Sequence, residues 1–355
     1  MKWLFKVVSP LVFLFSFAYE SHAQDIAFTQ FYAVPYQLNP ALTGAIDASY
    51  QVGMIYRDQW RGALEDPLTT IAFGGEVKFD LNFRKKRGLT DRAGVSLFFL
   101  SDKVSIYDFN TNQIAISTAF HKLLSEKTNQ YLSIGTQMSI FQKNINFDQL
   151  NFGDEFNNLD GYTFPSNEPF PPNNFGFVDL SIGLNYTVKP TDATKIYAGA
   201  ALHHLLKPNI SFYAKEDNID PTIFTDYKYD QRFAGHISVD QKIREYTTLQ
   251  PRILFQTQGP NQQYKLGANI KQDFTGHKNG VYFGAWLNLV DNFDGLGLHS
   301  VSPMVGFQTG SFVLGFSYDV NLDQTLKGTS GLNSFELSIR FLGDYYNDDG
   351  FCPVF

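Results

Sequence analysis

Large apolar residues and small or polar residues alternate along most of this chain. Between Tyr131 and Lys143, Leu132, Ile134 and Ile140 fall on one face of an extended strand. Gly, Asn, Asp and Pro separate such segments, and none has a convincing helical period. Fourteen segments of about ten residues show this period of two: 49–57, 68–79, 92–100, 109–120, 131–143, 177–186, 195–204, 231–240, 249–257, 263–271, 280–288, 297–307, 311–320 and 334–341. The pattern predicts an all-β fold of fourteen antiparallel strands.

The two faces of these strands differ in a way that favours a membrane environment. The apolar face carries mainly Phe, Leu, Ile and Tyr, whereas the opposite face is rich in Ser and Gly. Charged residues make up only 18% of the chain and aromatic residues 16%. These are too few charges for a barrel or sandwich whose whole outer surface faces water. Seven glycines fall on the polar face: Gly53, Gly74, Gly94, Gly135, Gly183, Gly199 and Gly315. We therefore predict a single transmembrane β-barrel, with an apolar band facing lipid and a polar lumen, rather than a soluble sandwich.

The lengths of the connections agree with a barrel in the outer membrane. Single-chain barrels of this kind have an even number of strands, with short periplasmic turns and longer extracellular loops. The two longest connections, about 144–176 and 206–230, are the fifth and the seventh. Odd-numbered connections share one side of the membrane, so we expect both long loops to be extracellular.

The first residues have the features of a secretory signal peptide. Lys2 and Lys6 flank the start of an apolar stretch that is too short to span a membrane, and Ser21-His22-Ala23 is a small-x-small cleavage site. We expect cleavage after Ala23 and a mature start at Gln24. The predicted organisation is a signal peptide (1–23), an N-terminal segment (24–47), the barrel (48–341) and a C-terminal tail (342–355).

Charge and motifs exclude several functional classes. The net charge is -7 and there is no cluster of basic residues to bind phosphates, which excludes a nucleic-acid-binding protein. His203 and His204 are adjacent on a strand and point to opposite faces, so they cannot share a metal. The chain has one Cys and contains no recognised hydrolase, phosphate-binding or dinucleotide-binding motif. We therefore predict no enzymatic activity, no cofactor and no metal site.

Several charged residues fall on the polar face and are expected to line the lumen. They are Arg57, Glu76, Lys78, Asp179, His203, Asp319, Glu336 and Arg340, with His236 and Asp240 beside them. One interpretation is structural: an ion-pair ladder that braces the wall or fixes a plug, because polar interiors are normal in such barrels. The other interpretation is a grip on a segment bound inside the lumen.

The fifth connection is the best candidate for binding a partner. Residues 144–176 carry five carboxylates and no Lys or Arg, interleaved with aromatic residues and prolines. Exposed aromatic residues are common anchors of protein interfaces. The candidate partner-binding residues are Phe156, Tyr162, Phe164, Asp154, Glu155 and Asp160. The alternative is that these aromatics fold back over the barrel mouth as a lid.

Short motifs give the chain a resemblance to a known family. They comprise Gln30-Phe31-Tyr32, Asn39-Pro40-Ala41 with Gly44, the run from Tyr56 to Trp60, and the closing Cys352-Pro353-Val354-Phe355. This pattern resembles the PorP/SprF family of type IX secretion system membrane proteins, and the resemblance covers essentially the whole mature chain.

The resemblance implies an outer-membrane barrel needed for secretion or cell-surface anchoring of a partner. That partner is often a gliding-motility adhesin with a non-cleaved C-terminal domain, and other type IX components are further implied partners. The residues themselves support only an outer-membrane barrel with two large outward loops. A passive or fatty-acid-type channel, which would conduct ions and have no protein ligand, is the alternative.

Overall fold

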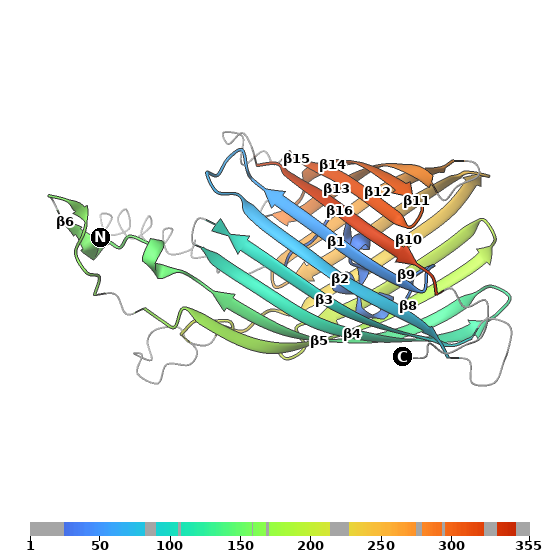
Figure 1. Cartoon of the computed structure of the whole chain (residues 1–355), viewed down its shortest axis with the longest axis horizontal. Helices are drawn as coiled ribbons and strands as arrows, with labels where there is room; N and C mark the ends of the chain where they lie inside the picture. Colours follow the sequence, from blue (N-terminus) through green and yellow to red (C-terminus); the bar gives the residue numbers. More distant parts are fainter. Residues whose placement is uncertain are drawn as a thin grey trace, which may run out of the picture.

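The computed structural model describes residues 25–81, 90–105, 108–157, 159–167, 170–213, 227–274, 279–292, 295–322 and 332–345. Fourteen antiparallel strands close into one barrel, in which each strand pairs with its neighbours in the chain and β16 pairs back with β1 (Figure 1). The strands are β1 (Tyr50–Gln59), β2 (Leu68–Asp80), β3 (Arg92–Val104), β4 (Phe109–Ser125), β5 (Gln130–Asn144), β8 (Asn174–Thr191), β9 (Thr194–His203), β10 (Arg232–Arg244), β11 (Thr247–Gln258), β12 (Asn261–Asp273), β13 (Asn279–Asn292), β14 (Gly295–Thr309), β15 (Phe312–Asn321) and β16 (Ser334–Gly343). The predicted fold class and number of strands are confirmed.

Closure between the first and last strands removes the edges of the sheet. β1 and β16 pair over their whole lengths, from Tyr50 opposite Gly343 to Gln59 opposite Ser334. A closed ladder satisfies the backbone polar groups that water cannot reach inside a bilayer. Among the described residues, no helix is both long and apolar enough to cross a membrane.

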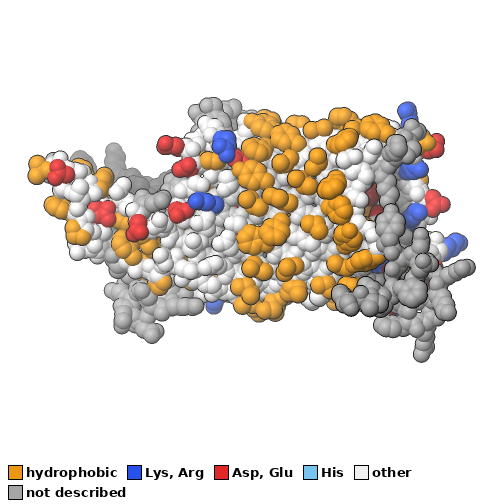
Figure 2. Space-filling model, in the orientation of Figure 1, with side chains coloured by type: hydrophobic (Ala, Val, Ile, Leu, Met, Phe, Trp, Pro, Cys, Tyr) orange, Lys and Arg blue, Asp and Glu red, His pale blue; other side chains and the backbone are white. Residues whose placement is uncertain are grey.

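The alternation along each strand separates a lipid face from a lumen face. Residues of β5 alternate between exposed and buried almost throughout: Ile134 is 48% exposed, whereas its neighbour Ser133 is 1% exposed. Hydrophobic side chains form a broad belt around the middle of the barrel (Figure 2). Such a belt matches the apolar band of outer-membrane barrels.

The connections are distributed as the strand count predicts. The long connection between β5 and β8 leaves the barrel at the left in Figure 1 and contains the small hairpin of β6 (Phe156–Asn157) and β7 (Gly161–Tyr162). The connection between β9 and β10 begins at the same end, which we call the long-loop end. Two-residue turns such as Gly310–Ser311 close the opposite end, the short-turn end.

The N-terminal segment lies inside the barrel. Residues 25–48, called the plug from here on, form η2 (Phe31–Ala33), α2 (Pro35–Leu38) and η3 (Pro40–Leu42). They appear in blue within the ring of strands in Figure 1. The plug runs from Asp25 near the long-loop end to Ala48 at the short-turn end, where β1 begins.

Candidate functional site

Glycines on the lumen face let the backbone of the plug approach the wall. An ideal Cβ built on Gly53 would lie 2.4 Å from the carbonyl oxygen of Ala33, and one on Gly135 would lie 2.4 Å from the amide nitrogen of Ala41. Gly74, Gly94, Gly183 and Gly315 meet plug atoms in the same way. Any side chain at these positions would push the plug away, so the glycines form the surface on which it is seated.

Asn39 fixes the middle of the plug to β8 and β10. Its Nδ2 donates to the carbonyl oxygen of Leu184 at 3.0 Å and lies 3.2 Å from Nε2 of His236. Its Oδ1 accepts from the backbone N–H of Ala41 at 2.9 Å and so caps η3. Asn39 is therefore both a helix cap and a fully buried tie to the wall.

Glu336 holds the start of η2 with its carboxylate. The backbone N–H groups of Thr29 and Gln30 each donate to a different oxygen of Glu336, both at 2.8 Å. The Gln30 side chain donates to Ser317 Oγ at 3.0 Å and accepts from Ser338 Oγ at 2.6 Å. Charge-assisted bonds of this kind are stronger than neutral ones, so this contact defines the position of the plug in the lumen.

Aromatic residues add further contacts between the plug and the wall. Phe31 packs edge-on against Trp286 with ring centroids 5.6 Å apart, and Tyr36 packs against Phe98 at 5.7 Å. Each pair joins the plug to a strand on a different side of the barrel. The core of this barrel is thus formed between the plug and the wall.

A cluster of charges ties the plug at the long-loop end. His204, the first residue after β9, places Nε2 2.8 Å from Asp25 Oδ2 and Nδ1 2.8 Å from Asp179 Oδ2. Arg232 Nη1 lies 3.2 Å from Asp25, and the hydroxyl of Tyr229 also donates to Asp25. We call Asp25, Asp179, His204, Tyr229 and Arg232 the outer latch.

The outer latch is held in its charged form. Burial disfavours the protonated ring of His204, but the carboxylates of Asp25 and Asp179 outweigh burial and raise the pKa of His204 to about 9. Burial alone would raise the pKa of the Asp25 carboxyl, but His204 and Arg232 hold that pKa well below its usual range. Both charges are therefore present at neutral pH.

Eight of the charged residues predicted to line the lumen touch the plug directly or through one intermediate residue. Arg57 donates to the carbonyl oxygen of Ala27 at 2.6 Å, and Lys78 donates to that of Ile46 at 3.0 Å. The remaining contacts are Glu76 with the N–H of Gly44, His203 with the carbonyl oxygen of Leu38, Asp319 with Thr29, Glu336 as above, Arg340 over the ring of Tyr32, and Asp179 through His204. The segment held in the lumen is thus the N-terminal part of the same chain.

The motif residues divide between the plug and the rim. Gln30, Phe31, Asn39 and Pro40 are buried in the plug, and Tyr32 is partly buried there. Trp60 directly follows β1 at the long-loop end, with a positive φ of 63° and a side chain that is 37% exposed. Cys352 lies outside the described residues. The sequence marked these residues as distinctive without indicating that five of them pack together inside the barrel.

The fifth connection carries two different groups of aromatic residues. Phe147 and Phe152 pack on Phe170 within the loop, at centroid distances of 5.2 and 4.9 Å. Phe156 and Tyr162 pack on each other across the β6–β7 hairpin, yet each is about half exposed. The hairpin projects beyond the long-loop end in Figure 1 instead of folding over the barrel.

The candidate carboxylates of this loop also differ in their environment. Asp154 accepts from Ser166 Oγ at 3.0 Å and from the N–H of Asn167, and Glu155 accepts from the N–H of Phe152 at 3.2 Å. Asp154 and Glu155 thus hold the loop in shape. Asp160 lies exposed at the turn of the hairpin, beside Leu159, which is 92% exposed. Phe164 is exposed nearby.

Comparison with solved structures finds other outer-membrane barrels at low identity. A Pseudomonas aeruginosa FadL homologue is 12% identical, with 85% of this chain and 92% of that chain covered and a TM-score of 0.49. The Ralstonia pickettii toluene transporter TbuX is 10% identical, with 92% and 96% covered and a TM-score of 0.47. A mutant of the monoaromatic hydrocarbon channel TodX is 10% identical, with 87% and 93% covered and a TM-score of 0.47.

Comparison of the sequence with families and with curated proteins gives two further results. No curated protein matches the chain. A family model described as type IX secretion system membrane protein PorP/SprF matches residues 20–341, which include the plug and nearly the whole barrel. The chain belongs to the PorP/SprF family of type IX secretion system membrane proteins, and it is an outer-membrane β-barrel.

Proposed function

We propose that this protein is a non-catalytic docking component of the type IX secretion system, needed to secrete an exported partner or to anchor it at the cell surface. The observation that carries the proposal is the contrast between the lumen and the outer hairpin. The lumen is occupied by the plug, which is tied to both halves of the wall. The β6–β7 hairpin, in contrast, presents half-exposed aromatic rings beyond the barrel. An exposed aromatic hairpin suits docking on the outer surface, whereas conduction would need an open lumen.

The proposed docking surface is the tip of the fifth connection. Phe156, Tyr162 and Phe164 are each more than half exposed, and Leu159 extends furthest into solvent. Rigid aromatic side chains that become buried at an interface supply most of its binding energy. Because Phe156 and Tyr162 pack on each other, they lose little conformational freedom on binding. The partner proposed is an exported adhesin, or its non-cleaved C-terminal domain.

Acidic residues of this loop favour a basic patch on the partner. Residues 144–176 contain no Lys or Arg, and the exposed Asp160 lies at the hairpin turn. Complementary charges mainly accelerate encounter, so added salt should slow association more than it speeds dissociation. Alanine at the three aromatic positions should instead raise the dissociation rate.

The test removes the tip and leaves the barrel intact. Deleting Asn151 to Pro172 should give a folded, heat-modifiable barrel that no longer retains the partner at the cell surface, because barrel stability resides in the closed ladder of strands. The triple variant Phe156→Ala, Tyr162→Ala and Phe164→Ala should lower retention at least 10-fold. Leu206→Ala is the matched control, since Leu206 is 53% exposed at the same end but belongs to another connection.

Quantitative proteomics of the cell surface, with co-purification from native membranes, provides the readout. Loss of the partner in the deletion and triple variants, with normal retention in Leu206→Ala, supports docking on the hairpin. Normal retention by the deletion variant would contradict the proposed site and direct attention to the mouth of the plugged lumen.

We further propose that the chain reaches the outer membrane after cleavage following Ala23. The pattern of charged, apolar and small residues in the first 23 positions supports this. N-terminal sequencing of the membrane-bound form should start at Gln24, and an intact Met1 would contradict it.

A further inference from the structure

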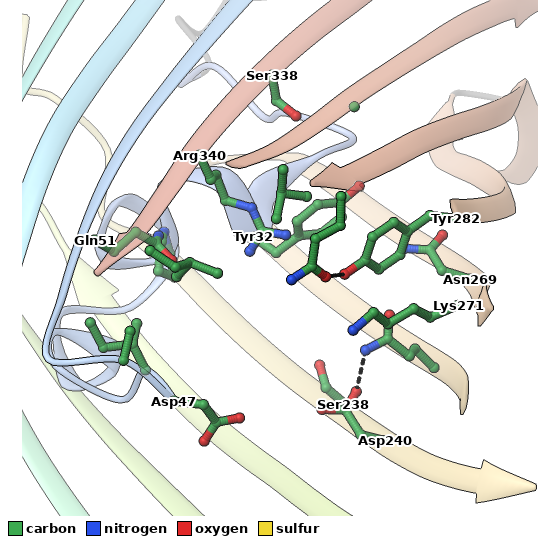
Figure 3. Close-up of a pocket in the computed structure, with 18 of the residues that line it drawn as sticks. Tyr32, Asp47, Gln51, Ser238, Asp240, Asn269, Lys271, Tyr282, Ser338 and Arg340 are labelled. Carbon is green, nitrogen blue, oxygen red and sulfur yellow. Dashed lines mark hydrogen bonds between the residues drawn. The ribbon is translucent and has the colours of Figure 1, made fainter. Parts of the chain in front are cut away.

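A cavity of about 550 Å³ lies between the plug and the wall at the short-turn end. Its rim includes Ser311 in the turn after β14 and Asp344 just after β16, and its roof is formed by the plug. Figure 3 shows side chains from the plug and from several strands directed into this space, among them Tyr32 of the plug and Tyr282 and Arg340 of the wall. The volume falls within the range of about 300–1,000 Å³ that is typical of small-molecule sites.

Two arginines of this cavity meet at one tyrosine ring. The guanidinium carbon of Arg252, on β11, lies 4.8 Å from the ring centroid of Tyr32, and that of Arg340, on β16, lies 5.3 Å from it. The plug therefore brings guanidinium groups from separated strands into one place. Cation–π contact orients each group but leaves the N–H donors at its edge free for a ligand.

Neither arginine is neutralised by a close ion pair. The nearest carboxylate to Arg252 is that of Asp240 at 3.9 Å, and the same oxygen already accepts from Gln250 at 2.9 Å. Nη1 of Arg252 is buried without a hydrogen-bond partner. Within the described part of the chain, no carboxylate lies within ion-pair distance of Arg340.

The other charged groups around the cavity already have partners. Lys271 Nζ lies 2.8 Å from Asp273, and Asp47 lies 2.6 Å from Lys195 Nζ. The charged groups of the cavity that can still donate hydrogen bonds to a ligand are therefore the guanidinium groups of Arg252 and Arg340, beside Tyr32. Asn269, which is 2% exposed, also lines the cavity, but its Oδ1 lies against Gly284 of the neighbouring strand.

We propose that this cavity binds a carboxylate-bearing ligand that enters from the short-turn, periplasmic end. The carboxylate lies beside Tyr32 and accepts hydrogen bonds from Arg252 and Arg340, whose planar groups suit such acceptors. Phe31 and Val313, which also line the cavity and are buried, cover the apolar part of the ligand. The proposal is independent of the docking role of the outer hairpin.

Two sources of this chemistry are distinguished by the choice of probe. N-acetylphenylalanine represents a small organic acid, and a hexapeptide ending in a free phenylalanine carboxylate represents a chain end. Each is titrated by isothermal calorimetry into the full mature barrel in a non-ionic detergent, beside its amide, which lacks the charge. We expect saturable binding of at least one acid and binding at least 10-fold weaker for its amide.

Variants locate the site. Arg252→Gln and Arg340→Gln should each weaken binding of the acid about 10-fold or more, in line with the loss of a charged hydrogen bond. Arg340→Lys keeps the charge without the planar group and should weaken binding less. Arg92→Gln is the matched control, because Arg92 lies near the short-turn end but pairs with Asp80 at 3.0 Å and does not line this cavity. Heat-modifiability of each variant confirms that the barrel is folded.

Each outcome decides between the alternatives. Tighter binding of the small acid assigns a free metabolite, and tighter binding of the peptide assigns a chain end. Equal binding of acid and amide, unchanged binding by both folded Gln variants, or no saturable binding of either acid would overturn the proposal.

Discussion

Gly135 has no room for even one methyl group. An alanine Cβ there would lie 2.4 Å from backbone atoms of Pro40 and Ala41, which cannot move without shifting η3. We therefore expect Gly135→Ala to loosen the plug and to destabilise the protein by about 1–3 kcal/mol, the usual cost of overpacking. Thermolysin cleavage within residues 25–48, mapped by mass spectrometry, should rise at least several-fold.

Gly235→Ala is the matched control for this prediction. Gly235 is also a strand glycine, but the nearest atom to a Cβ built there belongs to the Phe233 side chain and lies at an ordinary contact distance of 3.6 Å. It should leave both cleavage and stability close to the wild-type values. Equal behaviour of the two variants would show that the plug does not depend on close approach at Gly135.

The raised pKa of His204 leads to a second prediction, on how stability depends on pH. Because its pKa is raised from 6.5 to about 9 in the folded protein, its stabilising contribution is complete below about pH 6.5 and is lost as pH rises through 9. This shift corresponds to a contribution of His204 to the free energy of unfolding that is on the order of 3 kcal/mol. The melting-temperature gap between wild type and His204→Gln should therefore be widest at pH 6 and close above pH 9. A gap that stays constant from pH 6 to pH 10 would contradict a charged latch.

Sequence alternation assigned most strand residues to the correct face but did not identify their partners. The expectation that His203 and His204 point to opposite faces was wrong, because β9 ends at His203 and His204, with a positive φ of 59°, also turns its ring to the plug. Ser133 and Gly183 were expected on a polar lumen face, and both lie there. In the structure Ser133 is fully buried and bonds to His121, whose other ring nitrogen lies 2.8 Å from the carbonyl oxygen of Thr43. Gly183 meets Asn39, which is far away in the chain. A period of two reports which side a residue takes, not what fills that side.

At the scale of the strand, the lipid face allows a depth-dependent prediction. Ile134 projects outward from β5 and is 48% exposed, on the same apolar face as Leu132, Met138 and Ile140. Ile134→Arg should lower the free energy of unfolding in lipid by about 2–4 kcal/mol, whereas an arginine near the interface costs about 0–1 kcal/mol. Leu124, outward-facing near the end of β4, provides the interfacial control as Leu124→Arg. Refolding titrations in lipid vesicles measure both, and equal costs would show that Ile134 lies outside the apolar band.

Strand number and order were predictable, while some strand ends were not. The segment expected at 177–186 is Asn174–Thr191 in the structure, and the one expected at 109–120 ends at Ser125. Beyond the bilayer both faces of a strand meet water, so the alternation fades although pairs such as Lys143 with Phe175 continue the ladder. The two-residue strands β6 and β7 are too short to produce any period.

At the scale of the whole molecule, the position of the plug was the main feature that the sequence did not predict. Its helical turns have three or four residues each, so no period identifies them. Its position arises from contacts distributed over many strands, such as Gln30 with β15 and β16 and Asn39 with β8 and β9. The glycines and charges of the lumen face were visible in the sequence, and together they suit a wall that holds a segment.

The plug leads to the prediction that separates a docking barrel from a passive channel. Wild-type protein in planar bilayers should conduct little, because the plug obstructs the lumen. Deleting Phe28 to Ala41 removes η2 and α2, most of η3 and the contacts to Glu336, Trp286 and Leu184. The strand ladder stays closed, so this variant should remain heat-modifiable and show conductance at least 10-fold higher. Deletion of Asn151 to Pro172 is the control, since it shortens an outer loop without touching the plug and should stay as closed as wild type. If wild-type protein conducts as well as the plug-deleted variant, the lumen is open in the membrane and the channel alternative becomes the better account of this family member.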